Sequence, residues 1–268
     1  MRTAIIAIGK HEEKYLNEWI EYHLSIGFDT IFFIDNNEKE NRNQEYICNK
    51  YKNVECIVKN FSNNQFGLQK NSYIEIFNKI KKDFDWIAFI DIDEFLNFNG
   101  KSVNEFLSQP CFNNAEEILI NWKNFGDNDL VFYENKPVRK RFTKPYLDTQ
   151  CYSQKFPENE IVKCLLSTKA NIISHNIHTV KINGVIKNAD GIQIEENWRQ
   201  PISYKNAFIE HYETKTIEEY IKRKILSKNA MNTKNPANAL KRLEWFFNVN
   251  KHTEDKDLIY NFIKSHTH

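Results

Sequence analysis

The first half of the chain alternates short apolar runs with segments of helical periodicity. Thr3–Ile8 is an almost wholly apolar run that ends at Gly9, which is typical of a buried strand. Between Glu12 and Ile26 the apolar residues recur every three or four positions, which predicts an amphipathic helix. The same alternation continues toward residue 90. It predicts strands at Thr30–Ile34, Val54–Val58 and Trp86–Ile90, and helices at Gln44–Tyr51 and Gln69–Lys81.

This order of strands and helices favours an α/β fold with a Rossmann-like, mostly parallel sheet flanked by helices. The second half is less regular. Its patterns predict strands at Glu117–Trp122, Val162–Ser167 and Asn171–Val180, and helices at Glu218–Lys228 and Ala237–Asn248. We therefore expect one α/β domain over residues 1–210 and a helical extension over residues 211–268 that packs on it and faces the membrane or the acceptor.

Polar residues follow three of the predicted strands at their carboxyl ends. These segments are Gly9–Glu12, Asp35–Asn37 and Asp91–Glu94. Parallel sheets bind their ligands at this edge. Because the carboxyl ends of parallel strands meet at one edge, we expect the three segments to converge on one binding site.

Asp91 and Asp93 have the most specific chemistry of these residues. They follow the apolar run Trp86–Ile90, and burying a strand that leads into two carboxylates is costly unless a cation neutralises them. Residues i and i+2 of an extended strand point the same way, so both carboxylates can reach one ion. Such oxygen ligands suit Mn²⁺ or Mg²⁺ bound to a diphosphate. The alternative is a solvated acidic turn, because Asp-x-Asp is a common pattern.

Five segments of the chain match the motifs of one family when they are taken together. Trp86–Phe95 resembles a W-(aliphatic)-x-F-x-D-x-D-E-F core. The other four resemble E-W-x-x-Y-H-x-x-x-G, D-N-x-S, N-W-R-x-F-G and H-Y-x-T-K-S, and they are Glu18–Gly27, Asp35–Asn37, Asn121–Gly126 and His211–Thr216. These are motifs of glycosyltransferase family 92 and its bacterial family-2-like relatives, which the chain resembles over most of residues 3–228.

This resemblance implies a GT-A fold and an inverting transfer of a hexose from a UDP-sugar, with Asp91 and Asp93 on the metal. It places the uridine near Lys10, Glu12 and Asp35. The remaining contacts to the nucleotide sugar are expected from Gln69, Asn71, Ile92, Trp122 and His211. For Trp122 and His211 the alternative is a structural role, in core packing and as a buried histidine.

The chain departs from the family motifs at three places. They are His11 in place of Asn before Glu12, Asp127-Asn128-Asp129 in place of S-S-G, and Thr216 in place of Ser. The first puts a nucleotide contact at His11 in question, and the second changes the expected contact to the acceptor.

The third metal ligand and the catalytic base are less clearly marked. In GT-A enzymes a late histidine often completes the metal shell, so the resemblance indicates His178, with a hydrogen-bonded strand-end histidine as an equal alternative. Inversion needs a base that takes the proton of the acceptor hydroxyl. Asp127 and Asp190 are the candidates, and each is also explained as an ordinary loop carboxylate.

Composition and charge narrow the classes of function. The chain is 41% hydrophobic, as globular proteins are, and its formal net charge of +1 argues against a nucleic-acid binder. The five cysteines form no CxxC pair, and the short first apolar run and the lack of any long one lead us to expect neither a signal peptide nor a membrane span. We therefore expect a cytoplasmic protein. The basic segment Lys215–Arg242 would bring it into peripheral contact with the inner face of the plasma membrane.

Together these observations favour an inverting, metal-dependent glycosyltransferase of polysaccharide biosynthesis. Analogy with bacterial relatives suggests a glycan or glycolipid acceptor such as lipooligosaccharide or capsule. Two alternatives stay open. A metal-dependent nucleotidyltransferase would need a Gly-rich phosphate loop, which is absent from the sequence. The other is a non-catalytic module that binds a nucleotide or a sugar.

Overall fold

A computed structural model describes residues 1–59, 67–147, 157–226 and 236–250. The chain forms two compact units, each built from two segments. The first unit combines Met1–Trp122 with Glu160–Glu210, and the second combines Lys123–Asn159 with His211–His268. The segment 123–159 is thus grouped with the C-terminal segment, while the expected division of function at residue 210 stays a prediction.

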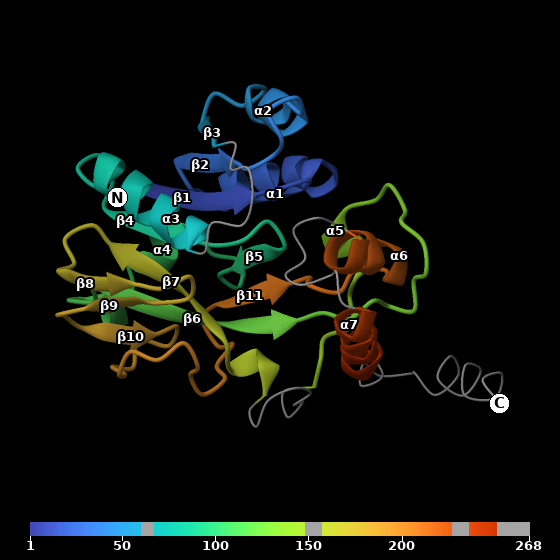
Figure 1. Ribbon diagram of the computed structural model, residues 1–268. Coiled ribbons are helices and arrows are strands. Elements are labelled where there is room, and N and C mark those ends of the chain that lie inside the picture. Colours follow the sequence, from blue (N-terminus) through green and yellow to red (C-terminus); the bar gives the residue numbers. More distant parts are fainter. Residues whose placement is uncertain (60–66, 148–156, 227–235, 251–268) are drawn as a thin grey trace. The chain divides into compact units, whose positions relative to one another are not determined.

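The strands of the main sheet are β1 (Thr3–Gly9), β2 (Thr30–Asp35), β3 (Val54–Val58), β4 (Trp86–Phe89), β5 (Glu94–Asn97), β6 (Glu117–Asn124), β7 (Val162–Ser167), β10 (Ile186–Asn188) and β11 (Phe208–His211). They are ordered β3-β2-β1-β4-β7-β6-β11-β5, and β10 pairs with β6 outside this path (Figure 1). Strands β8 (Ile172–His175) and β9 (Val180–Ile182) form a separate antiparallel pair.

The pairing in this sheet is mostly parallel. Strand β1 runs parallel to β2 and β4, β2 to β3, and β10 to β6. Strand β7 is antiparallel to both of its neighbours, β4 and β6. The expected α/β class, a mostly parallel sheet flanked by helices, is confirmed. Because β7 reverses direction between them, β4 and β6 still end at the same edge of the sheet.

The helices of the first unit are α1 (Glu13–Ser25), α2 (Asn43–Cys48), α3 (Leu68–Ile80), α4 (Val103–Leu107) and the short η1 (Pro110–Phe112). The sequence predicts α1 and α3 to within one residue at each end, whereas α2 ends earlier than expected. The unpredicted α4 begins with a capping box between Ser102 and Glu105, which satisfies amide groups of its first turn.

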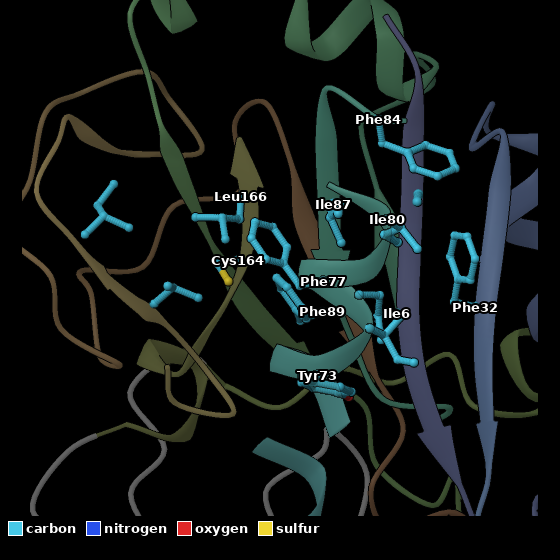
Figure 2. Close-up of a cluster of buried hydrophobic side chains, with 14 of the residues drawn as sticks. Ile6, Phe32, Tyr73, Phe77, Ile80, Phe84, Ile87, Phe89, Cys164 and Leu166 are labelled. Carbon is cyan, nitrogen blue, oxygen red and sulfur yellow. The ribbon is translucent and has the colours of Figure 1, made fainter. Parts of the chain in front are cut away.

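A buried apolar cluster lies between α3 and the sheet (Figure 2). Tyr73 and Phe77 are four residues apart, so they share one face of α3. The ring of Phe89 on β4 lies 5.3 Å from that of Tyr73 and 6.2 Å from that of Phe77. Burying each such side chain stabilises the fold by about 1.5–3 kcal/mol. This packing fixes α3, and with it the first turn of the helix, against the end of β4.

One predicted element of the first unit is wrong. Asn171–Val180 is not a single strand, because β8 ends at His175 and β9 begins at Val180. Between them the amide of Asn176 donates to the carbonyl of Thr179 over 2.9 Å, which closes a tight turn. The polar run between the two strands favours this turn over continued pairing.

The second unit contains α5 (Val138–Arg141), η2 (Glu158–Glu160, which it shares with the first unit), α6 (Ile217–Tyr220), the π-helical turn η3 (Ile221–Leu226) and α7 (Pro236–Asn250). The prediction of a regular helix over Glu218–Lys228 is corrected, because α6 gives way to η3 at Ile221. Lys228, at the end of that prediction, lies outside the described residues. The predicted helix Ala237–Asn248 is confirmed as α7.

Candidate active site at the carboxyl edge of the sheet

The register of the strands brings the predicted segments to one edge of the sheet. Gly9 at the end of β1 pairs with Asp35 at the end of β2. Ala88 on β4 and Ile118 on β6 both pair with Leu165 of β7. Asp91 and Asn121 each follow three residues later in the chain, Asp91 just past the end of β4 and Asn121 within β6. The ends of β1, β2, β4 and β6 are therefore aligned, as a parallel arrangement requires.

Asp91 and Asp93 lie on a tight turn and not on an extended strand. Strand β4 ends at Phe89, and the amide of Glu94 donates to the carbonyl of Asp91 over 3.1 Å. Because they stand on a turn, these two side chains are not held on one side of an extended strand, as the sequence predicted. Asp93 is nearly buried, with 9% of its surface exposed. Ile92, between them, is buried and belongs to the hydrophobic core.

Helix α1 holds this turn from behind. The indole nitrogen of Trp19 donates to the carbonyls of Asp91, 3.1 Å away, and Glu94, 2.8 Å away. One turn later the hydroxyl of Tyr22 donates to the carbonyl of Leu96 over 2.7 Å. The E-W-x-x-Y-H motif thus has a structural role here, because its aromatic residues fix the backbone of the turn over residues 91–94, the aspartate turn.

The carboxylate of Asp91 has a hydrogen-bond donor on each oxygen. Gln69 Nε2, at the start of α3, lies 2.7 Å from Asp91 Oδ1, and the hydroxyl of Tyr73 lies 3.5 Å from the same atom. Lys163 Nζ, from β7, lies 2.7 Å from Asp91 Oδ2. Gln69 thus lies beside Asp91, while its expected contact to the nucleotide sugar stays a prediction. Lys163 was not foreseen.

Lys163 and Glu94 extend this cluster into the core. Lys163 Nζ lies 3.6 Å from Glu94 Oε1, and both side chains are buried. Burial alone would lower the pKa of Lys163, but the charges of Asp91 and Glu94 outweigh it and raise the pKa above its ordinary value. Burial raises the pKa of Glu94 well above its usual range, and the charge of Lys163 opposes that shift. Lys163 is therefore a charged ammonium group at neutral pH.

His178 follows Ile177, whose carbonyl shares the ammonium group of Lys163 with Asp91. Lys163 Nζ also donates to the carbonyl of Ile177, 3.2 Å away. The His178 ring lies 5.5 Å from that of Trp122 and 6.1 Å from that of Trp198. Across the described part of the chain, no three His, Cys, Asp or Glu side chains gather so that they could hold a metal ion. The predicted metal shell of Asp91, Asp93 and His178 stays a prediction.

The residues predicted for the nucleotide lie around Gln44 of α2. Gln44 Nε2 donates to Asp35 Oδ1 over 2.6 Å, and the amide of Glu12 donates to Gln44 Oε1 over 2.8 Å. Burial raises the pKa of Asp35, and its Oδ2 atom is buried with no hydrogen bond from a described residue. Lys10 forms an ion pair with Glu38 at 3.0 Å. Gln44 thus joins Glu12 to Asp35 at the ends of β1 and β2, and the contacts of Lys10, Glu12 and Asp35 to a nucleotide stay predictions.

Other predicted residues of the first unit are less closely tied to the aspartate turn. Asn71 is exposed in the early part of α3. Asp190 accepts a hydrogen bond from the hydroxyl of Ser203. Asn188, the last residue of β10, pairs with Leu119 on β6, and Asp190 lies in the turn that follows β10. Its role as the base stays a prediction.

Asp127 and His211 belong to the second unit. Asp127 Oδ1 accepts from the amide of Asp129 over 3.0 Å, so the side chain closes its own turn. His211 is buried, and its Nδ1 lies 2.6 Å from Asn124 Oδ1. These contacts agree with the structural alternatives for both residues. The role of Asp127 as the base and the contact of His211 to the nucleotide sugar stay predictions.

The sequence held weak signals for the residues that were missed. Lys163 interrupts the apolar run Val162–Leu166, and a lysine inside such a strand needs a buried anionic partner. Gln44 lies in a short helix with no strong pattern, and only the fold brings it to Asp35.

The model of glycosyltransferase family 92 matches residues 7–249 of the chain. The chain belongs to glycosyltransferase family 92. A family 92 protein of Oryza sativa subsp. japonica is 30% identical over 91 residues, which are 34% of this chain and 15% of that protein. One of Ricinus communis is 22% identical over 180 residues, which are 62% of this chain and 30% of that protein. The match thus spans less than a third of the length of either relative.

Two solved structures are similar to this family 92 chain at low identity. Staphylococcus aureus TarS residues 1–349 give a TM-score of 0.42 at 14% identity, with 96% of this chain and 74% of that chain covered. The galactosyltransferase LgtC, solved with donor and acceptor sugar analogues, gives a TM-score of 0.28 at 14% identity, with 62% of this chain and 58% of that chain covered. In the described part of the structure, no helix has the length and apolar character needed to cross a bilayer.

Proposed function

We propose that this family 92 chain is a glycosyltransferase that moves a hexose from a UDP-sugar to a glycan or glycolipid acceptor. The observation that carries the proposal is the family match over residues 7–249. The aligned ends of β1, β2 and β4 support it, because an α/β sheet binds nucleotides at this edge.

The proposed donor site runs from Asp35 to the aspartate turn. The buried Oδ2 atom of Asp35 is suited to accept a hydrogen bond from a nucleotide base. Lys10, at the end of β1, supplies a positive charge at the same edge. Gln69 and Asn71 are at the start of α3, where the helix presents amide groups that favour phosphate. These contacts would hold a nucleoside diphosphate along the strand ends.

The predicted metal ligands fit a cation only in part. Asp91 is already engaged by Lys163 and Gln69. Asp93 and His178 are held near the same turn but do not form a three-ligand group with it. When bound, Mn²⁺ or Mg²⁺ would offset the charge of the departing diphosphate.

The proposed reaction is a single displacement. The acceptor hydroxyl oxygen forms the new bond to the anomeric carbon as the bond from that carbon to the diphosphate breaks, and UDP leaves with the electron pair. The hydroxyl proton passes to a carboxylate, for which Asp127 and Asp190 are the candidates. Trp122, which is half-buried at the end of β6, offers an aromatic face to a sugar ring.

The acceptor and its location remain part of the proposal. The proposed acceptor is a surface glycan or glycolipid that is built at the inner face of the membrane. The basic segment Lys215–Arg242 would be attracted to the anionic lipid headgroups there. Part of that segment lies outside the described residues. In the described part, Lys222 pairs with Glu218, and Lys224 with Glu213, 3.0 Å away. These pairs reduce the charge left for lipid headgroups.

The proposal is tested by incubating the full chain with a panel of UDP-sugars, with and without Mn²⁺, and measuring released UDP. We expect release with at least one donor, and a loss of at least about tenfold in Asp93→Ala. Asp83→Ala is the matched control, because Asp83 is exposed in the turn before β4, at the opposite edge of the sheet.

Three outcomes would contradict the proposal. Release of pyrophosphate would indicate nucleotidyl transfer. Binding of a UDP-sugar with no turnover would indicate a non-catalytic module. An equal loss of UDP release in Asp93→Ala and Asp83→Ala would show that the aspartate turn is not part of the site.

A further inference from the structure

Two cysteines meet where α2 packs on β3 (Figure 1). Cys48 is the last residue of α2, and Cys56 is the middle residue of β3. Between them the amide of Tyr51 donates to the carbonyl of Cys48 over 3.0 Å, and the amide of Val54 donates to the carbonyl of Tyr51 over 3.2 Å. These hydrogen bonds fold the connecting segment into tight turns, so the end of the helix stays close to the strand.

The pleat of β3 directs Cys56 toward Cys48. Ile57 packs against the apolar cluster on the α3 side of the sheet. Since side chains alternate along a strand, its neighbour Cys56 points to the opposite face. There the thiol of Cys48 donates a hydrogen bond to the sulfur of Cys56. Both cysteines are free thiols, and their sulfur atoms are in contact.

The two thiols differ in their exposure and in how firmly they hold a proton. Cys48 is fully buried, whereas Cys56 is half-buried. The hydrogen bond to Cys56 and burial raise the pKa of the Cys48 thiol well above its ordinary value, and the charge of Asp35 adds to the shift. Cys48 therefore keeps its proton. The Cys56 sulfur, which accepts the hydrogen bond, is the one that a small solute can reach.

We propose that Cys48 and Cys56 are a redox modification site, at which hydrogen peroxide joins the two sulfur atoms in a disulfide. The Cys56 thiolate attacks one peroxide oxygen as the O–O bond breaks, and the departing hydroxide takes up the proton that Cys56 released. The Cys48 sulfur then attacks the sulfenic acid at Cys56, and the S–O bond breaks. The second hydroxide takes the Cys48 proton. Two thiols and one peroxide thus give one disulfide and two waters, and the peroxide takes up the two electrons that the thiols lose.

The disulfide ties the end of α2 to β3. One turn earlier on the same helix, Gln44 accepts from the amide of Glu12 and donates to Asp35. A covalent link at Cys48 therefore restrains the helix that joins the ends of β1 and β2, and it also restricts the unfolded chain. The modification site is independent of the proposed transfer, because it needs only the two thiols and a peroxide.

The test treats the reduced full chain with hydrogen peroxide and digests it with trypsin in the absence of a reductant. Trypsin cleaves after Lys50 and Lys52, so it separates residues 43–50, which contain Cys48, from residues 53–59, which contain Cys56. Only a disulfide keeps these two peptides together. We expect mass spectrometry to find the linked pair, lighter by two hydrogens than the sum of the peptides, and dithiothreitol to separate it.

Two variants test the order of the steps. Cys48→Ala removes the second thiol, so Cys56 should stay a sulfenic acid that dimedone traps. Cys56→Ala removes the accessible thiol, so oxidation of the buried Cys48 should be slower by at least about tenfold. Cys111→Ala is the matched control, because Cys111 is also half-buried, and it should form the linked peptides as the wild type does. Circular dichroism checks the folding of each variant.

Hydrogen exchange measures whether the disulfide restrains α2. We expect the amides of residues 43–48 to exchange at least about threefold more slowly in the oxidised chain than in the reduced chain. If Cys48→Ala does not fold, peptide mapping of the wild type and of Cys56→Ala still decides the matter. The proposal is overturned if the oxidised wild type lacks the linked peptides, if Cys48 reacts as fast in Cys56→Ala as in the wild type, or if α2 exchanges equally in both states.

Discussion

At the scale of single residues, one buried carboxyl group makes the stability of the first unit depend on pH. Glu117 on β6 is fully buried, and its Oε1 accepts from the amide of Val180 over 2.7 Å. Burial raises the pKa of Glu117 to about 8, and the charge of Glu196 adds to the shift. The folded chain therefore retains a proton that the unfolded chain releases near the ordinary value of 4.5.

This shift predicts a stability difference between the wild type and Glu117→Gln. Between pH 4.5 and about 8 only the folded wild type holds the proton, so its free energy of unfolding should fall as pH rises. The slope from this one group is at most about 1.4 kcal/mol per pH unit. Glutamine accepts from Val180 but does not titrate. Urea unfolding at pH 5 and pH 8 gives the free energy of unfolding of both chains. The same change between the two pH values in the wild type and in Glu117→Gln would contradict the prediction.

The residues that the sequence predicted are those that follow a recognisable pattern. Asp91 and Asp93 stand directly after a buried strand, and Asp35 ends another. Lys163 and Gln44 have no such pattern, because their roles depend on contacts between elements far apart in the chain. Lys163 meets Asp91 across 72 positions of sequence, and Gln44 reaches Asp35 only when α2 folds back on β2. Such contacts are set by tertiary packing.

At the scale of elements, regular periodicity was the reliable guide. Helices α1 and α3 have apolar faces that pack on other elements, and their bounds followed from the pattern. The region after β9 combines short strands, a π-helical turn and loops, and there local patterns decide little. In the second unit a buried ion pair joins α5 to α6. Arg141 donates to Glu219 over 2.8 and 3.1 Å.

Breaking this ion pair should destabilise the second unit. Arg141→Met leaves the buried Glu219 carboxylate without its cation, which costs about 3–5 kcal/mol in the free energy of unfolding. Combining it with Glu219→Gln should recover part of that loss. Chemical denaturation of the two variants gives the comparison, with Lys140→Met as the control because Lys140 is exposed beside Arg141. If Arg141→Met has the same free energy of unfolding as the control, the ion pair does not stabilise the second unit.

At the scale of the whole molecule, two units are built from interleaved segments of chain. The first unit takes Met1–Trp122 and Glu160–Glu210, and the second takes the intervening and C-terminal segments. No linker composition marks these boundaries, because the chain crosses between the units within β6, η2 and β11. A reading of the sequence in order therefore favoured a single boundary at residue 210. Only the contacts of the folded chain reveal that segment 123–159 groups with the C-terminal segment.

This organisation predicts how the chain tolerates truncation. A chain that ends at residue 210 keeps segment 123–159 but loses its partners in the second unit. Asn124 would lose His211, which lies 2.6 Å from it, and Arg141 would lose Glu219. Orphaned buried polar groups of this kind are costly, so we expect residues 1–210 to unfold without cooperativity or to aggregate.

A chain of residues 1–250 is the matched control, because it retains every described residue of the second unit. Thermal unfolding followed by circular dichroism distinguishes the two chains, and UDP release shows whether either still uses a donor. If residues 1–210 unfold cooperatively at the temperature of the control and consume the same UDP-sugar, they form an independent domain as the sequence predicts. The contacts between segment 123–159 and the C-terminal segment would then be dispensable for both folding and donor use.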